Sequence, residues 1–356
     1  MGRPFRSFKM EKQTILPIKE EYKQDWAKYN LAKTNEKRLF YELLKQLSTI
    51  IIEPKSKIGR PSVPLKDLFF CAGLKLYSNY SGRKAVSDYK LAKQAGYIEK
   101  QPHFNTLKDF LNCDVTYDLL KRLLTITAMP LRNMEDKYSL DSSGFGSYQF
   151  ERWRRIKEDP RQHRNYLKGH ILIGTRTNII CNCEITPGNF SDPKQAPKII
   201  LEANNNFKIK EFSADKAYSS KLIFRILESI NVIPYIPFRK RTKETDEQDL
   251  WGRMYNEFKK NQNEWYRHYH IRSNVETTFS MIKRRFGEIL LSKNYVSQRN
   301  ELMMKFICHN IACLIQEIFE RKIEIDFSKE AYFLVERKVP DEFITRDASK
   351  VKNEDY

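Results

Sequence analysis

The stretch from Ile209 to Ile236 reads IKEFSADKAYSSKLIFRILESINVIPYI and decides the fold class. Its first part, Ile209–Asp215, is a short apolar run that ends on an acid, and it predicts a strand. Ser219–Asn231 has a helical pattern, and Val232–Ile236 is β-branched and apolar, which predicts a second strand. A strand, a helix and a strand in succession predict helices packed on a sheet.

Strand and helix patterns of the same kind begin just after Pro130. Two apolar, β-branched runs joined by a polar turn predict a hairpin. The further predicted elements are, in order, the strands Lys137–Asp141, Leu167–Gly174 and Asn178–Thr186 and the helices Pro193–Asn204 and His270–Phe286. The order is three strands, then helix, strand, helix, strand, helix. It predicts an α/β fold with a mixed sheet flanked by helices.

Residues 1–130 are predicted to be helical. The expected helices are Pro64–Tyr77, one capped by Ser81 that runs through Ala95, and one capped by Asn105. Short helices with lysines and arginines between them suit a helix-turn-helix-like DNA reader, although a helical bundle that only braces the next domain fits equally well. We therefore predict an all-α domain over 1–130, the sheet domain over 131–320 and a peripheral tail over 321–356.

Charge and composition restrict the classes of molecule that this protein is expected to bind. Lys and Arg number 64 against 45 Asp and Glu, a net charge of +19, which favours a polyanion such as nucleic acid over a merely basic surface. No run approaches the roughly 18 apolar residues of a membrane span, and no secretory signal opens the chain, so we expect a cytoplasmic protein with no membrane partner. The six cysteines fit neither a disulfide framework nor a zinc site.

Two acids stand where sheets of this class place their chemistry. Asp141 and Asp215 each follow an apolar strand and precede small or polar residues. A carboxylate buried there needs a partner charge, and a divalent metal supplies one. Either acid by itself would also fit a helix cap or a turn.

A third acid lies on the predicted helix His270–Phe286. At about 100° per residue, an apolar stripe is formed by Val275, Phe279, Ile282 and Phe286. An adjacent polar stripe is formed by Tyr269, Arg272, Glu276 and Lys283. Packing the apolar stripe on the sheet would place Glu276 at the edge of the buried face. The alternative is an ordinary surface pair of Arg272 with Glu276.

These residues resemble a known family. Tyr269, Arg272, Glu276 and Lys283, with two, three and six residues between them, resemble the Tyr-Arg-Glu-Lys signature of insertion-sequence DDE transposases. Asp141 in LDSSG resembles that family's first catalytic acid, and Asp215 in ADKAYSS resembles the second. The segments 168–170 and 186–192 also resemble stretches that follow the first acid. The resemblance covers about residues 60–315.

The resemblance implies an RNase-H-like sheet domain preceded by an all-α DNA-binding domain. It implies that Asp141, Asp215 and Glu276 are catalytic and hold two Mg²⁺ ions, with Mn²⁺ as a substitute and Asp141 bridging both ions. Phosphate contacts are expected from Arg272 and Lys283. Tyr269 is expected to position a phosphate or to pack. We also expect DNA contacts at Lys168 and Arg239 and in the basic run Arg152, Arg154, Arg155, Arg161 and Arg164.

The resemblance further implies a transposase that binds terminal inverted repeats and catalyses metal-dependent cleavage and strand transfer. Its partners would be element-end and target DNA, with no small-molecule substrate. A homodimer is expected, because two ends must be joined, and the site of action would be the prokaryotic nucleoid. The alternatives are a catalytically silent DNA-binding protein and an RNase-H-like nuclease without strand transfer. The intact set of acids argues against the first, and the signature around Glu276 argues against the second.

Overall fold

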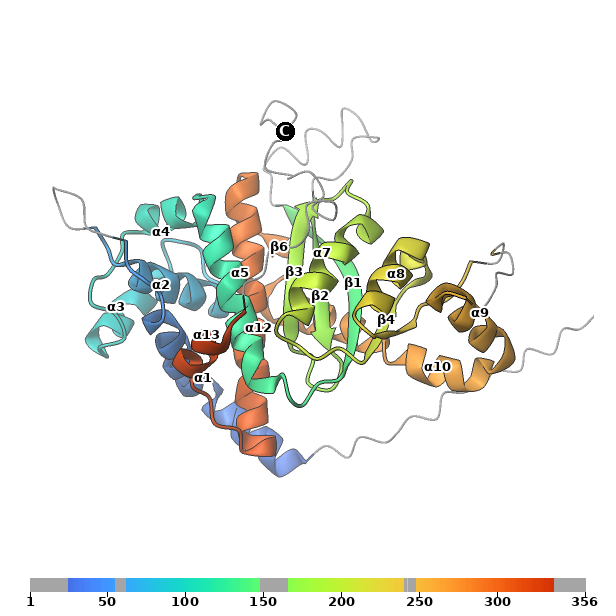
Figure 1. The fold of residues 1–356 in the computed structure, drawn as a ribbon. Helices are drawn as coiled ribbons and strands as arrows, with labels where there is room; N and C mark the ends of the chain where they lie inside the picture. The colour runs from blue at the N-terminus through green and yellow to red at the C-terminus, as the bar shows by residue number, and fades with distance from the viewer. Residues whose placement is uncertain (1–24, 55–61, 148–165, 240–241, 243–247, 336–356) are drawn as a thin grey trace, which may run out of the picture.

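A computed structural model describes residues 25–54, 62–147, 166–239, 242 and 248–335. A single sheet occupies the centre of this part of the chain (Figure 1). Its strands are β1 (Lys137–Ser147), β2 (Tyr166–Gly174), β3 (Ile180–Pro187), β4 (Glu211–Ala214), β5 (Ile233–Tyr235) and β6 (Ile289–Leu290).

The strand order is β3-β2-β1-β4-β5, which is the order of an RNase-H-like core. The strands β1, β2 and β3 pair antiparallel, whereas β4 lies parallel to β1 and β5 lies parallel to β4. The predicted mixed sheet and its hairpin are confirmed. The predicted end of the first strand at Asp141 was wrong, because β1 continues to Ser147. The residues beyond Asp141 still pair with β2, and the last two pair with β6.

Helices cover both faces of the sheet, and the alternation of side chains along β1 shows which helix covers which face. On one face Tyr138 contacts Phe207, which follows α7 (Asp192–Asn204). On the other face Phe145 contacts Phe279 of α11 (Ser273–Phe286) and Phe306 of α12 (Tyr295–Arg321). The helix α8 (Lys221–Ser229) connects β4 to β5 and packs beside α7.

The region before the sheet is helical, as predicted. Its helices are α1 (Trp26–Thr49), α2 (Leu65–Tyr77), α3 (Val86–Gln94), α4 (Phe104–Leu111) and α5 (Val115–Ala128), followed by the short turn η1 (Met129–Leu131). The cap of α4 is His103 rather than the predicted Asn105. In Figure 1 the long helix α12 runs between these helices and the sheet, and it packs against both. The two regions therefore share one core, and the functional division at residue 130 stays a prediction.

By length and composition, α12 resembles a membrane span. However, 78% of its apolar 18-residue window is buried inside the protein. Its buried polar side chains bond to neighbouring elements: Asn310, for example, bonds both backbone groups of Ile180. We therefore describe α12 as a core helix.

The tail beyond α12 also packs in part. The helix α13 (Phe327–Phe333) buries Phe327, and Glu330 forms an ion pair with Arg132. Further along, Val335 exchanges two hydrogen bonds with the side chain of Asn206, at 2.8 and 3.0 Å. The rest of the predicted tail lies outside the described residues.

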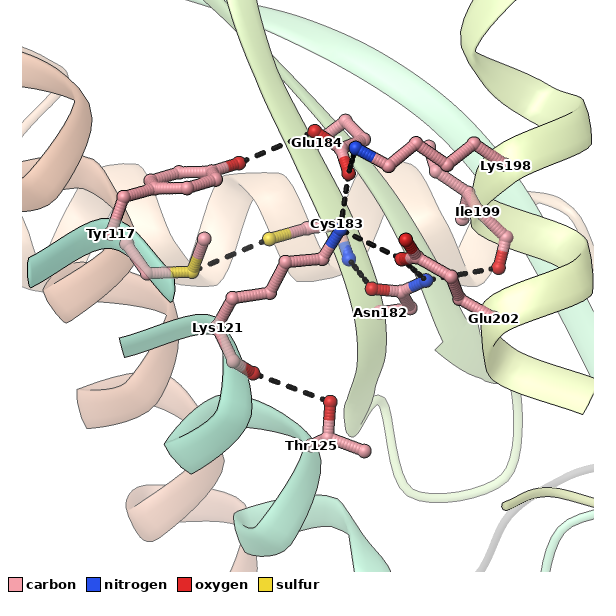
Figure 2. A network of polar contacts seen from close by, with 10 residues as sticks. Tyr117, Lys121, Thr125, Asn182, Cys183, Glu184, Lys198, Ile199 and Glu202 are labelled. Atoms are coloured by element: carbon pink, nitrogen blue, oxygen red, sulfur yellow. Dashed lines mark hydrogen bonds and ion pairs between the residues drawn. The ribbon is translucent and has the colours of Figure 1, made fainter. Parts of the chain in front are cut away.

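A buried ion network joins the helical region to the sheet domain (Figure 2). Lys121 of α5 contacts the carboxylates of Glu184 on β3 and of Glu202 on α7, the latter at 2.7 Å. Lys198 of α7 contacts Glu184 at 2.9 Å. Burial by itself raises the pKa of Glu184, but the two ammonium groups outweigh burial and lower the pKa to about 2. The network thus holds Glu184 ionised at the junction.

Close packing under β2 leads to a first prediction. A Cβ atom added at Gly169 would lie 2.7 Å from Cζ of the buried Phe306. We expect Gly169→Ala to lower the free energy of unfolding by about 1–3 kcal/mol, because the core must shift to admit the methyl group. Gly146→Ala is the matched control, because no heavy atom lies within 4 Å of its added Cβ. Equal urea midpoints for the two variants would contradict the packing described.

Candidate active site

The register of two strands brings the first two acids together. The parallel pairing of β1 with β4 ends at Leu140 opposite Ala214. Asp141 and Asp215 are the next residues on these neighbouring strands, so they lie side by side on the same face, at the point where β4 ends and β1 continues. Asp141 accepts a hydrogen bond from the amide of Ser142 at 2.8 Å, and Asp215 accepts one from Lys216 at 2.7 Å. These local bonds orient the Asp141 carboxylate within β1 and the Asp215 carboxylate at the start of η2 (Lys216–Tyr218).

The third acid reaches the same face from α11. The contact of Phe145 with Phe279 places this helix over β1, and Glu276 lies in its first turn. Arg272, the residue that precedes α11, donates to Asp141 Oδ2 at 2.9 Å and to Glu276 Oε1 at 2.5 Å. One guanidinium therefore links the first acid to the third.

The helix that carries these residues is not continuous. The helix predicted over His270–Phe286 is confirmed from Ser273 to Phe286, but its predicted start was wrong, because His270 ends α10 (Gln262–His270) and a turn separates α10 from α11. Tyr269 therefore lies on α10, and Arg272 lies at the start of α11. The pair of Arg272 with Glu276, which the sequence offered as the alternative, forms across the first turn of α11, and the same guanidinium also contacts Asp141.

Electrostatics at Asp141 show that the acids act on one another. Burial raises the pKa of Asp141, and the carboxylates of Asp215 and Glu276 raise it further, against the Ser142 amide and Arg272. Burial is the largest cause, so the ionised form of Asp141 depends on positive charge nearby. Such a site gains free energy from an added cation.

The donor set fits a hard divalent cation in kind, because carboxylate oxygens are the ligands that Mg²⁺ prefers. Within the described residues, however, no three His, Cys, Asp or Glu side chains stand close enough together to hold a metal ion. The position between Asp141 and Glu276 is taken by Arg272. Metal binding at these acids would therefore need this guanidinium to move.

Two more residues of the signature border the acids. Lys283 donates to Ser143 at 2.8 Å, and its ammonium lies 5.2 Å from the ring centre of Phe145. The ring of Tyr269 stacks on the buried Trp265, with 5.5 Å between the centroids, and Arg272 lies 5.8 Å from it. Lys283 and Tyr269 thus lie on opposite sides of Glu276 along the chain, both near the acidic face.

The remaining predicted DNA contacts lie elsewhere. Lys168 points to the opposite face of the sheet, where it binds Asp192 at 2.9 Å and the carbonyl of Phe190 at 3.1 Å. Arg239 is exposed in the loop after β5. The basic run from Arg152 to Arg164 lies outside the described residues. His170 is a buried core histidine, with Nε2 at 2.9 Å from Thr186 Oγ1.

Three further residues, which the sequence predictions did not include, lie around the acids. Ser143 accepts a hydrogen bond from Lys283, and the ring of Trp265 stacks on the ring of Tyr269. Tyr218 is buried beside both strand acids: burial raises its pKa, and the charges of Asp141, Asp192 and Asp215 add to that effect. Its place in the segment ADKAYSS was the available signal, because an aromatic ring three residues after an acid can pack beneath it.

The fold and these acids define a class: an RNase-H-like sheet with an acidic site at the edge where β1 and β4 part. A family model described as transposase DDE domain matches residues 132–311, which is half of the chain and includes all three acids. The chain belongs to the DDE transposase family. A comparison with curated proteins finds no match.

Proposed function

We propose that this chain is an insertion-sequence transposase that binds terminal inverted repeats and catalyses metal-dependent DNA cleavage and strand transfer at Asp141, Asp215 and Glu276. The observation that carries the proposal is the arrangement of the acids. Two of them are adjacent on neighbouring strands, and Arg272 ties the third to the first. The expected assembly on DNA is a homodimer, at work on the nucleoid of a prokaryote.

Two Mg²⁺ ions, or Mn²⁺ in their place, would be held by the three carboxylates and would supply an activated water and a stabilised leaving oxygen. The water oxygen bonds to phosphorus as the P–O3′ bond breaks, and the 3′-oxygen leaves as a hydroxyl. In strand transfer the oxygen of the new 3′-hydroxyl would bond to a target phosphorus as the target P–O3′ bond breaks, and the displaced target 3′-oxygen would leave as a hydroxyl. Arg272 and Lys283 would bind the phosphates that flank the reacting one.

The experiment that tests this function uses duplex DNA that carries one element end and its flanking host sequence. The full chain should nick this DNA at the end of the repeat in Mg²⁺, should join the 3′-hydroxyl to a target plasmid, and should do neither in EDTA. Nicking without joining would favour a nuclease, and binding without nicking would favour a silent DNA-binding protein.

Lys283 provides a prediction about phosphate contact. We expect Lys283→Ala to weaken binding of the cleaved end and to lower the slope of log affinity against log salt by about one, because one phosphate contact is lost. Lys208→Ala is the control, since this exposed lysine precedes β4 at the end of the strand away from Asp215. Filter binding at several salt concentrations measures the slope. An unchanged slope in Lys283→Ala would assign this side chain to Ser143 alone.

Sequence preference is proposed to come from residues 1–130. Exposed lysines mark the outer surfaces of two short helices: Lys90 and Lys93 on α3 and Lys108 on α4. Because α12 packs on α1, α2, α4 and α5, the test uses the full chain. We expect a variant with Ala at all three lysines to lose most of the preference for repeat DNA over scrambled DNA, while nicking of a bound end survives. A preference equal to that of the wild type would place the reader elsewhere.

A further inference from the structure

The guanidinium of Arg272 lies where a cation of the active site would be expected. It donates to Asp141 at 2.9 Å and to Glu276 at 2.5 Å, and its side chain is only 18% exposed. We propose that Arg272 is a placeholder cation, which neutralises the acids in the metal-free protein and leaves them when a divalent ion and a DNA phosphate bind. This inference rests on the proposed function, because it assumes that the acids bind metal.

The contacts require competition between Arg272 and a metal ion. Asp141, Asp215 and Glu276 repel one another, and the planar guanidinium fork satisfies two of them at once. Each of its bonds uses a carboxylate oxygen that a hard ion would bind. Two cations cannot share these oxygens at contact distance without strong repulsion. An ion that enters between Asp141 and Glu276 must therefore displace the guanidinium.

The Arg272 side chain also has one contact that does not depend on the carboxylates. Arg272 lies in the turn between α10 and α11, so its side chain can swing without disturbing the interior of a helix. The ring of Tyr269 lies 5.8 Å from the guanidinium carbon and is held in place by Trp265. A cation is stabilised over such a ring, and from there it can reach a phosphate.

Metal and DNA are therefore linked through one side chain. Both ligands favour the state in which Arg272 has left the carboxylates. Each ligand should then raise the affinity for the other by the same factor, because binding linkage is reciprocal. In the absence of DNA, the bound guanidinium should keep the affinity for metal low, and stray metal-dependent nicking would be suppressed until an end is bound.

The opposite role is a permanent brace. If Arg272 holds Asp141 and Glu276 in the geometry that metal needs, its removal should weaken metal binding. The two roles thus predict changes of opposite sign in the same quantity. The affinity of the DNA-free protein for Mn²⁺ separates them, and it does not depend on catalytic activity.

The experiment titrates Mn²⁺ into the full chain without DNA and follows free Mn²⁺ by electron paramagnetic resonance. We expect Arg272→Met to bind Mn²⁺ about tenfold more tightly than the wild type, because a charge-assisted competitor is gone. Arg284→Met is the matched control. It removes one charge from the same helix, and Arg284 is exposed with no hydrogen bond or ion pair among the described residues. The control should change the affinity by no more than about twofold, because solvent screens exposed charge.

A second arm repeats the titration with a pre-cleaved DNA end, which has no bond left to cut. DNA should tighten Mn²⁺ binding in the wild type and should do so less in Arg272→Met. Unchanged or weaker Mn²⁺ binding by a folded Arg272→Met protein would overturn the inference. If that variant does not fold, Arg272→Lys decides, since one ammonium cannot form the two-carboxylate fork and should also tighten Mn²⁺ binding.

The same titration separates this inference from the proposed function. If the Asp141→Ala variant binds Mn²⁺ as tightly as the wild type does, the proposed metal site is wrong, and the placeholder role is wrong with it. Binding that depends on Asp141 but is not tightened by either Arg272 variant would overturn the placeholder role only.

Discussion

Replacing Asp141, Asp215 or Glu276 with Ala is expected to lower Mg²⁺-dependent cleavage of element-end DNA by about a thousandfold or more, while DNA binding survives. The groups act as a unit, so the loss of one should cost nearly as much as the loss of all three. Cleavage is followed on labelled DNA ends at saturating protein, and binding is followed by gel shift with the same ends.

The matched control for these variants is Asp136→Ala. Asp136 lies just before β1, at the end of the strand away from Asp141, and its partly exposed carboxylate pairs with Lys210 at 3.2 Å. Its loss should leave cleavage unchanged. A variant of any of the three acids that cleaves at the wild-type rate would remove that residue from the catalytic centre.

The second large effect concerns stability. We expect Lys121→Ala to lower the free energy of unfolding by about 3 kcal/mol, because the buried carboxylate of Glu184 keeps Lys198 but loses the second ammonium, and the half-buried carboxylate of Glu202 loses its ammonium partner. Lys210→Ala is the control, because it breaks an exposed pair that contributes at most about 1 kcal/mol. Urea denaturation measures both variants. Similar losses of unfolding free energy in Lys121→Ala and Lys210→Ala would mean that water screens the charges of the network.

The pH dependence of the same network has a definite sign. The pKa of Glu184 is lowered in the folded chain to about 2, from an ordinary value of 4.5. Its ionised form therefore stabilises the fold above the ordinary value, and this stabilisation is lost as pH falls through that range toward 2. The difference in stability between the wild type and Glu184→Gln should narrow on acidification. A difference that stays constant with pH would contradict an ionised Glu184.

Local sequence was sufficient to predict a strand before Asp141 and another before Asp215, because each acid follows a short apolar run that is typical of a buried strand. It could not supply the register of β1 with β4, which depends on residues 74 positions apart and sets Asp141 beside Asp215. The turn at Ile271 and Arg272 was missed because neither Gly nor Pro marks it. Tertiary packing causes this turn, since α10 packs Trp265 into an aromatic cluster while α11 packs on β1.

Charged residues of the core were also invisible to the sequence analysis. Lys121 and Glu184 read as solvated residues until α5 and β3 are brought together. In α12, Glu301 and Lys305 interrupt the apolar pattern, yet both are buried. Glu301 accepts from the amides of Leu291 and Ser292, and Lys305 donates to two carbonyls of the same segment. Such residues are placed by the loop they hold, and no periodicity reveals that loop.

The position of the bound ion tests the central claim most directly. Crystals of the full chain with a pre-cleaved DNA end, grown in Mn²⁺, would locate the ion by its anomalous scattering. We expect manganese peaks between the carboxylates of Asp141 and Asp215 and between those of Asp141 and Glu276, with Arg272 withdrawn from Asp141 and in contact with a phosphate. A protein that cleaves DNA in Mn²⁺ but shows its manganese peaks away from these carboxylates would contradict the claim.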